Sequence, residues 1–131
     1  MEPAPRHQAR ERALTLLYEA DLKGEPPSVV VAALAVAPDD YTCSVLRSVE
    51  DGSAVIDALI GGAAIGWDVD RMAVVDRNVL RLAVAELRDR PDVPTAVVLN
   101  EAVELASAYS TDESGAFVNG VLATLALQIR G

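Results

Sequence analysis

The segment from Ser110 to Leu122, STDESGAFVNGVL, gathers the side chains of this sequence best suited to binding a ligand. Ser110 and Glu113 have the spacing of a capping box, in which a hydroxyl accepts from an early helix N–H while the carboxylate reaches back. The helix N-terminus leaves backbone N–H donors free, and Phe117 follows one turn inside it. Donors beside an aromatic ring can receive a nucleotide, with Ser114 leaving the approach open and Phe117 offering a face for a base to stack on.

The same segment also has a purely structural interpretation. Phe117 could be a core residue, and the glycines could simply allow two helices to approach each other. Under that interpretation we expect Asn119 to be buried and hydrogen-bonded to a neighbouring helix, with Gly120 permitting the contact. The residues alone leave both interpretations open.

The rest of the chain offers few residues of the types and spacing that enzyme catalysis requires. The one histidine, His7, lies near the N-terminus, which argues against a Ser-His-Asp or Cys-His arrangement and against a histidine-rich metal site. The one cysteine, Cys43, has no partner for an internal disulfide and fits packing in a reducing compartment. The glycines lack the spacing of phosphate-binding loops. We therefore expect no enzyme activity, no catalytic residues, no metal site and no cofactor.

Charge is unevenly distributed along the chain. The formal net charge is −9, and Arg47 is the one basic residue between positions 25 and 70. An acidic body argues against extensive phosphate binding. Near the N-terminus, however, Arg6, Arg10 and Arg12 are interrupted only by Glu11, which leaves a small basic end. Two partners of opposite charge are therefore compatible with this sequence.

Helical periodicity dominates the sequence, and no segment alternates as a strand would. The composition, 51% hydrophobic but only 4% aromatic, suits closely packed helices. We expect an all-α bundle of six or seven short helices, with Trp67 in a connecting stretch and with Asn119-Gly120 as an alternative hairpin signal. The first two helices are predicted from Pro5 to Lys23 and from Ser28 to Ala37. A longer helix should follow the Pro38-Asp39-Asp40 break and run through Ile60, with a kink at Gly52 and an end at Gly61-Gly62. The remaining helices are predicted from Val75 to Leu87, from Val98 to about Tyr109, and from the capping box to Ile129.

No apolar run approaches the roughly 20 residues that a membrane-spanning helix requires. The polar N-terminus also does not resemble a secretory signal. We expect a cytoplasmic protein with no membrane association.

Three stretches carry a resemblance to a known family. The string PTAVVLNEAVELASAYSTDESGAFVNGVL, from Pro94 to Leu122, closely resembles the signature end of the bacterial transcription antitermination factor NusB family. RHQARERALTLLYEAD at positions 6–21 and VDRNVLRLAVAEL at positions 75–87 resemble the same family in the same order. The resemblance covers essentially the whole chain and is weakest at positions 25–65.

This resemblance implies a single RNA-binding domain over residues 1–131, built from two packed helical subbundles. NusB proteins bind the boxA element of ribosomal RNA leader transcripts and pair with NusE, a ribosomal protein that doubles as a transcription factor. The pair helps assemble an antitermination complex on RNA polymerase, so RNA polymerase and other Nus factors are indirect partners. The family's role is not catalytic.

The resemblance also assigns RNA contacts. Arg6 and Arg10 match the family's arginine-rich N-terminal contacts and, four residues apart, share one helix face. Some relatives carry more arginine where this chain has other residues, and Ala116 replaces a lysine common in relatives. We therefore expect weaker RNA binding by this protein alone than by a lysine-rich relative. The implied RNA contacts are Arg6, His7, Gln8, Arg10, Glu113, Ser114 and Phe117.

NusE contacts are implied on two helices. Tyr18 lies on the first, and Asp76, Val79 and Glu86 lie on the helix that begins at Val75. Because ribosomal proteins are typically basic, an acidic surface there would suit such a partner. Alternatively, Tyr18 is a core residue with only its hydroxyl exposed.

Two rival interpretations remain. A similar domain occurs at the N-terminus of certain RNA cytosine methyltransferases, but this sequence shows no cofactor-binding glycine motif or catalytic cysteine domain after it. Some family members also form homodimers through the RNA face, so self-association stays open.

Overall fold

The computed structural model describes residues 4–131, and over this range the chain is all-helical, with seven α-helices, one short 3₁₀ helix and no strand. This confirms the predicted all-α bundle of six or seven helices. Asn119 and Gly120 lie inside the last helix, so the hairpin alternative is wrong. The elements are α1 (Ala4–Lys23), α2 (Pro27–Ala32), α3 (Asp40–Asp51), α4 (Ser53–Ala63), η1 (Val69–Arg71), α5 (Val74–Asp89), α6 (Thr95–Tyr109) and α7 (Asp112–Arg130).

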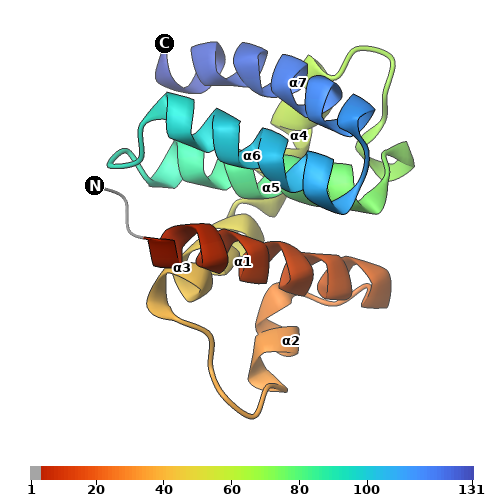
Figure 1. The fold of residues 1–131 in the computed structure, drawn as a ribbon. Coiled ribbons are helices and arrows are strands. Elements are labelled where there is room, and N and C mark those ends of the chain that lie inside the picture. The colour runs from red at the N-terminus through yellow and green to blue at the C-terminus, as the bar shows by residue number, and fades with distance from the viewer. Residues whose placement is uncertain (1–3) are drawn as a thin grey trace.

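The helices form two groups, α1–α3 and α4–α7 (Figure 1). Helix α5 joins them, because it contacts α1 and α3 of the first group as well as α4, α6 and α7 of its own. Its side chains Val79, Leu80 and Val84 are fully buried. Polar side chains of α5 are buried as well, among them Asn78 and Glu86, so this helix lies at the centre of the fold. The two groups correspond to the two expected subbundles.

Helix α1 matches its prediction closely. Pro5 lies in its first turn, and the helix ends before Gly24, whose φ of +65° favours glycine. Its buried stripe includes Ala13, Leu14 and Leu17, which follow helical spacing.

The second predicted helix is shorter and more exposed than expected. Helix α2 ends at Ala32 rather than Ala37, and Val30 is its one buried residue. Much of this segment is exposed, since Val29 is 47% and Val36 is 79% exposed. The helix packs only at the edge of the fold, against α1 and α3, so one face is enough to hold it.

The segment predicted as one long kinked helix forms two helices, α3 and α4, on either side of Gly52. Asp39 caps α3 by accepting from the backbone N–H of Thr42, and α3 ends where Gly52 was expected to produce a kink. The predicted end at Gly61-Gly62 is wrong by a short distance, because α4 continues through both glycines to Ala63. Each glycine has little or nothing near its Cβ position, so no close contact forces an earlier stop.

Helices α6 and α7 form an antiparallel pair joined by the short Ser110-Thr111 connection (Figure 1). Gly115 makes the close approach, because a Cβ there would meet the Ser107 hydroxyl and the Val103 side chain. The expectation for Asn119 and Gly120 is wrong: both are exposed, and nothing lies near the Cβ position of Gly120. The close contact occurs one turn earlier than the sequence suggested.

A polar network crosses between the two groups of helices. Asp21 of α1 accepts from the Arg77 guanidinium at 2.7 Å and from the Asn78 amide at 2.8 Å. Arg81 reaches the same carboxylate and also Asp57 of α4. Burial alone would raise the pKa of Asp21, but the bonds from Arg77 and Asn78 hold that pKa below its ordinary value.

Over the described part of the chain, no helix combines the length and the apolar character that crossing a bilayer requires.

Candidate nucleic-acid interface

The N-terminus of α7 is capped by Thr111, whose hydroxyl accepts from the backbone N–H of Ser114 at 3.1 Å. The predicted capping box is therefore wrong by one residue: the cap is Thr111 instead of Ser110, and Ser114 takes the third helical position instead of Glu113. The shift leaves Glu113 exposed in the first turn. Ser114 is buried, and its hydroxyl lies 2.9 Å from that of Ser110.

Ser114 also connects α7 to α5. Its hydroxyl donates to Oδ2 of Asp76 at 3.1 Å. The other oxygen of this buried carboxylate, Oδ1, has no hydrogen-bond partner. Asp76 was predicted as a partner contact, but the structure places it beside the candidate RNA residues of α7.

An open pocket of about 250 Å³ lies against this end of α7. Phe117 of α7 and Trp67 of the loop after α4 meet there edge to face, with ring centroids 6.1 Å apart and an interplanar angle of 66°. We call this hollow the α7 pocket. Its lining residues are Trp67, Met72, Ala73, Asp76, Thr111, Glu113, Ser114 and Phe117.

The α7 pocket brings together three residues that the sequence had grouped, Glu113, Ser114 and Phe117. The sequence reasoning missed Trp67 as a site residue. The available signal was an aromatic residue in a polar connecting stretch, where a ring has no helix face to bury it. The core interpretation of Phe117 is partly right as well, since the ring is half-buried and packs against the core.

The second candidate set lies on the first turns of α1. Arg6 is partly exposed, contacts Asp92 at 3.3 Å and stands over the Tyr41 ring at 4.6 Å. His7 contacts Glu101 of α6 through Nδ1 at 2.6 Å, and Gln8 is exposed. The hydrogen bond to Glu101 raises the pKa of His7 above its ordinary value, so its protonated form is favoured.

Arg10, the other member of this set, is buried. Its Nε lies 3.0 Å from each carboxylate oxygen of Glu86 on α5, and the two residues are only 1% and 2% exposed. The Tyr41 hydroxyl donates to the same carboxylate. Arg6 and Arg10 do share a helix face, because both guanidinium groups lie near the Tyr41 ring. In this structure, however, only Arg6 lies at the surface.

The four predicted partner contacts do not form one surface patch. Tyr18 is 39% exposed, whereas Val79 and Glu86 are buried in the contacts that α5 makes with its neighbours. Asp76 belongs to the α7 pocket. This burial follows from the central place of α5, which leaves few of its side chains facing solvent.

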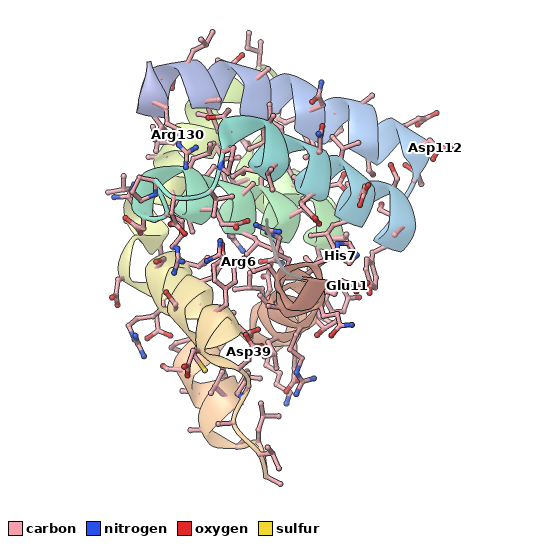
Figure 2. The ribbon with its side chains drawn as sticks, turned by 60° about the vertical axis from the view of Figure 1, so that its left-hand side comes forward. Arg6, His7, Glu11, Asp39, Asp112 and Arg130 are labelled. Carbon is pink, nitrogen blue, oxygen red and sulfur yellow. The ribbon has the colours of Figure 1, made fainter. Side chains whose placement is uncertain are left out.

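A hydrogen bond connects α1 to the end of α6. The Tyr109 hydroxyl at the end of α6 donates to Glu11 of α1 at 3.0 Å, and α7 begins three residues later. Figure 2 shows Asp112 at the N-terminal end of α7, which follows Tyr109 in the chain, and Arg130 at the opposite end of the helix. The middle of α1 is therefore tied to the end of α6 that leads into α7.

Among the described residues, His7, Glu101 and Glu104 are the one group whose ligand atoms lie close enough for a metal ion, within 4.8 Å of one another. The hydrogen bond between His7 and Glu101 accounts for much of this closeness.

Comparison with known proteins gives one family. The model of the NusB family matches residues 7–127. The chain is 45% identical over 124 residues to the transcription antitermination protein NusB of Thermobifida fusca, covering 92% of this chain and 87% of that protein. It is 46% identical over 127 residues to the NusB protein of Nocardioides sp., covering 92% of each.

Solved structures agree with this result. T. maritima NusB superposes with a TM-score of 0.84 at 32% identity, covering 97% of this chain and 94% of that one. A chain from a crystal structure of the antitermination factors NusB and NusE in complex with dsRNA gives a TM-score of 0.76 at 31% identity, covering 94% and 96%.

Proposed function

Because this chain belongs to the NusB family of transcription antitermination factors, we propose that it binds boxA RNA of ribosomal RNA leader transcripts together with NusE. The pair would help assemble an antitermination complex on RNA polymerase with other Nus factors. The single observation that carries the proposal is the α7 pocket, where the Phe117 and Trp67 rings stand beside polar groups at a helix N-terminus. Sequence-specific RNA recognition uses such combinations on unstacked bases.

The proposed RNA surface combines the two sets of residues described above. Arg6, His7 and Gln8 supply partly or fully exposed donors at the start of α1. Glu113, Ser114 and Phe117 supply the polar and aromatic walls at α7. Arg10 acts as a positioning residue, because its bond to Glu86 fixes the helix turn that carries Arg6.

NusE would contact the outer face of α1, where Tyr18 is the accessible member of the predicted set. Val79 and Glu86 would act from beneath, by fixing α5 against α1. The acidic composition of the chain favours a basic partner.

We assign the whole chain to one non-catalytic RNA-binding domain acting in the cytoplasm, where leader transcripts are made. Membership of a family of transcription antitermination factors supports the non-catalytic role.

The test is a titration of fluorescently labelled boxA-type RNA with the protein, alone and with NusE, across a salt series and against a scrambled RNA of equal length. Weak binding alone with a clear gain on adding NusE supports the proposal. For a single strand, the log–log salt slope should be about −0.7 per phosphate neutralised. No binding in either state by a folded protein contradicts it and indicates a protein adaptor.

Self-association is tested separately by measuring mass at micromolar concentration with and without RNA. If a homodimer hides the RNA surface, RNA should convert dimer to monomer. A dimer that persists while binding RNA tightly excludes that form of occlusion.

A further inference from the structure

Two arginines and an aspartate gather around the Tyr41 ring near the start of α1. The guanidinium carbons of Arg6 and Arg90 each lie 4.6 Å from the ring centroid. Asp92 joins these arginines, because its Oδ2 lies 3.3 Å from Nη2 of Arg6 and 3.1 Å from Nη2 of Arg90. We call Arg6, Tyr41, Arg90 and Asp92 the Tyr41 cluster. Helices α1 and α3 and the turn after α5 thus bring two positive charges to one exposed carboxylate.

The two guanidinium groups are accessible and only partly used. The side chains of Arg6 and Arg90 are each 25% exposed, and that of Asp92 is 50% exposed. Among the residues that the structure describes, Asp92 is the only hydrogen-bond acceptor of either guanidinium group. A guanidinium group carries five N–H donors, so each arginine keeps donors for a ligand.

The turn that carries Arg90 and Asp92 is fixed by Arg130 at the end of α7. Nη2 of Arg130 donates to the carbonyl oxygen of Arg90 at 2.9 Å, and its Nη1 donates to that of Val93 at 2.7 Å. The Tyr41 hydroxyl likewise donates to Glu86. Because the turn and the ring are held in the free protein, little conformational freedom is lost when a ligand binds there.

The oxygen shared by the two arginines indicates which ligand fits. Oδ2 of Asp92 accepts from both Arg6 and Arg90, so an anionic oxygen at this place receives two charge-assisted bonds. A phosphate group supplies several such oxygens, and the guanidinium fork matches their geometry. Tyr41 already packs against both guanidinium groups and donates its hydroxyl to Glu86, so it offers little surface to a base. The chemistry of the Tyr41 cluster therefore favours the backbone of a nucleic acid strand.

We propose that the Tyr41 cluster binds one backbone phosphate of the RNA, which takes the place of Asp92 between Arg6 and Arg90. This rests on the RNA-binding role proposed above and adds Arg90 as an RNA contact. Arg6 lies on the turn of α1 that also carries His7 and Gln8. An RNA strand bound along that turn therefore reaches the Tyr41 cluster.

Asp92 competes with the RNA in this arrangement. Exposed ion pairs contribute little to stability, so the carboxylate gives up its bonds at small cost. Its negative charge stays near the bound phosphate and opposes it. Removing this one carboxylate should therefore tighten RNA binding, whereas removing a contact residue should weaken it.

The test uses boxA-type RNAs in which one phosphate at a time is replaced by an uncharged methylphosphonate. Binding is measured in the presence of NusE for the wild-type protein, Arg90→Gln, Asp92→Asn and the double variant. Arg88→Gln and Asp89→Asn remove the same charges from the last turn of α5 and leave the bonds of the Tyr41 cluster in place, so they are the matched controls. Urea unfolding checks that each variant is folded.

We expect a methylphosphonate at one linkage to weaken wild-type binding on the order of tenfold, as for loss of a hydrogen bond to a charged group. Arg90→Gln should weaken binding of the unmodified RNA by a similar factor, be insensitive at that linkage and reduce the log–log salt slope by about 0.7. Arg88→Gln should keep the wild-type sensitivity.

Asp92→Asn should tighten binding by about two- to fivefold, the range for one exposed charge interaction. A damaged fold does not tighten binding, so this result is independent of any loss of stability. The double variant should lose most of the gain, because Arg90 and Asp92 act on the same phosphate.

Four results overturn the inference. RNA binding with no sensitive linkage, or with the same sensitivity in Arg90→Gln, removes the phosphate contact while leaving the RNA-binding function intact. Binding by Asp92→Asn that is no tighter than binding by Asp89→Asn removes the competition. A loss of NusE affinity in Arg90→Gln without RNA, with the sensitivity to methylphosphonate unchanged, would assign the Tyr41 cluster to a protein partner. Absence of RNA binding by a folded wild-type protein removes both the inference and the function on which it rests.

Discussion

Arg10 of α1 and Glu86 of α5 form a buried ion pair, in which the Arg10 Nε lies 3.0 Å from both carboxylate oxygens. The pair joins the two groups of helices where the candidate RNA surface begins. Tyr41 of α3 donates to the same carboxylate, so three helices converge on one side chain. Burial and this hydrogen bond raise the pKa of Tyr41, which keeps its hydroxyl protonated and able to donate.

Breaking this pair should cost much of the stability of the fold. Glu86→Gln removes the carboxylate closest to the buried Arg10 guanidinium and leaves Glu101, whose Oε1 lies 3.7 Å from Arg10 Nη1, so we expect about 3 kcal/mol less free energy of unfolding in urea. The double variant Arg10→Met/Glu86→Met removes both charges and should recover most of the loss. Glu19→Gln in the exposed Lys23 pair serves as control and should change little. A loss equally small in Glu86→Gln would show that the pair contributes no more than a surface contact.

The close approach of α6 and α7 predicts opposite effects for two glycines of one helix. A Cβ on Gly115 would collide with the Ser107 hydroxyl, so Gly115→Ala should destabilise the protein by about 1–3 kcal/mol. Gly120→Ala meets open space and should stabilise it by about 0.5–1 kcal/mol, because glycine is a poor helix former. Thermal unfolding of both variants checks the prediction, and Ser107→Ala should rescue Gly115→Ala in part. Equal effects at the two positions would contradict it.

His7 should make stability depend on pH in a defined direction. Its pKa is raised above 6.5 by the hydrogen bond that its Nδ1–H donates to Glu101, with smaller contributions from Glu11 and Glu104. A raised pKa means that the stabilisation is fully present below about pH 6.5 and is lost as pH rises through the folded-state value. The free energy of unfolding of wild type minus that of His7→Gln should thus be larger at pH 5.5 than at pH 8.5. A difference that grows with pH would refute the assignment.

Phe117 should contribute to RNA affinity through its ring. Phe117→Leu keeps an apolar side chain against the core but removes the stacking surface, so RNA binding should fall by about 5- to 150-fold, equivalent to about 1–3 kcal/mol. Leu127→Ala, on the exposed side of the same helix far from its N-terminus, is the control and should bind normally. Fluorescence anisotropy with boxA-type RNA measures both. Normal binding by Phe117→Leu would leave Phe117 a packing residue alone.

Ala116 offers a gain-of-binding test. The residue is exposed beside Phe117, and the family resemblance implies a lysine at this position in other members. Ala116→Lys should tighten RNA binding by the protein alone and steepen the log–log salt slope by about 0.7, the value for one additional phosphate contact on a single strand. Ala116→Gln adds length without charge and should leave the slope unchanged. Matched slopes for the lysine and glutamine variants would exclude a phosphate contact.

The sequence predicted where most helices lie, but it did not predict which individual side chains are buried or exposed. Gly24 and Asp39 acted locally, through a positive φ and a side-chain cap, so the boundaries they set were readable without knowledge of the fold. Arg10 and Glu86 depend on which helix packs against which, and no local pattern shows that two charged residues 76 positions apart neutralise each other. For the same reason Asp76 could be placed on a helix but not beside Phe117.

The α7 site was predictable only in part. Polar crowding followed by an aromatic residue indicated a capped helix start with a ring nearby, and the structure has both. The cap is Thr111, and the Ser114 side chain is held by Asp76, a tertiary contact that a local capping rule does not include. Trp67 joined the site through the packing of a loop, which periodicity does not describe.

Helix α5 also sets the distance between two parts of the candidate RNA surface. Asp76 reaches the α7 pocket from one end of this helix, and Glu86 holds Arg10 beneath Arg6 from the other. Ten residues of α-helix rise about 15 Å, and a buried helix neither stretches nor bends readily. An RNA strand that contacts both ends of α5 must therefore have a fixed number of nucleotides between the two contact points. One nucleotide inserted there would prevent both contacts from forming at once.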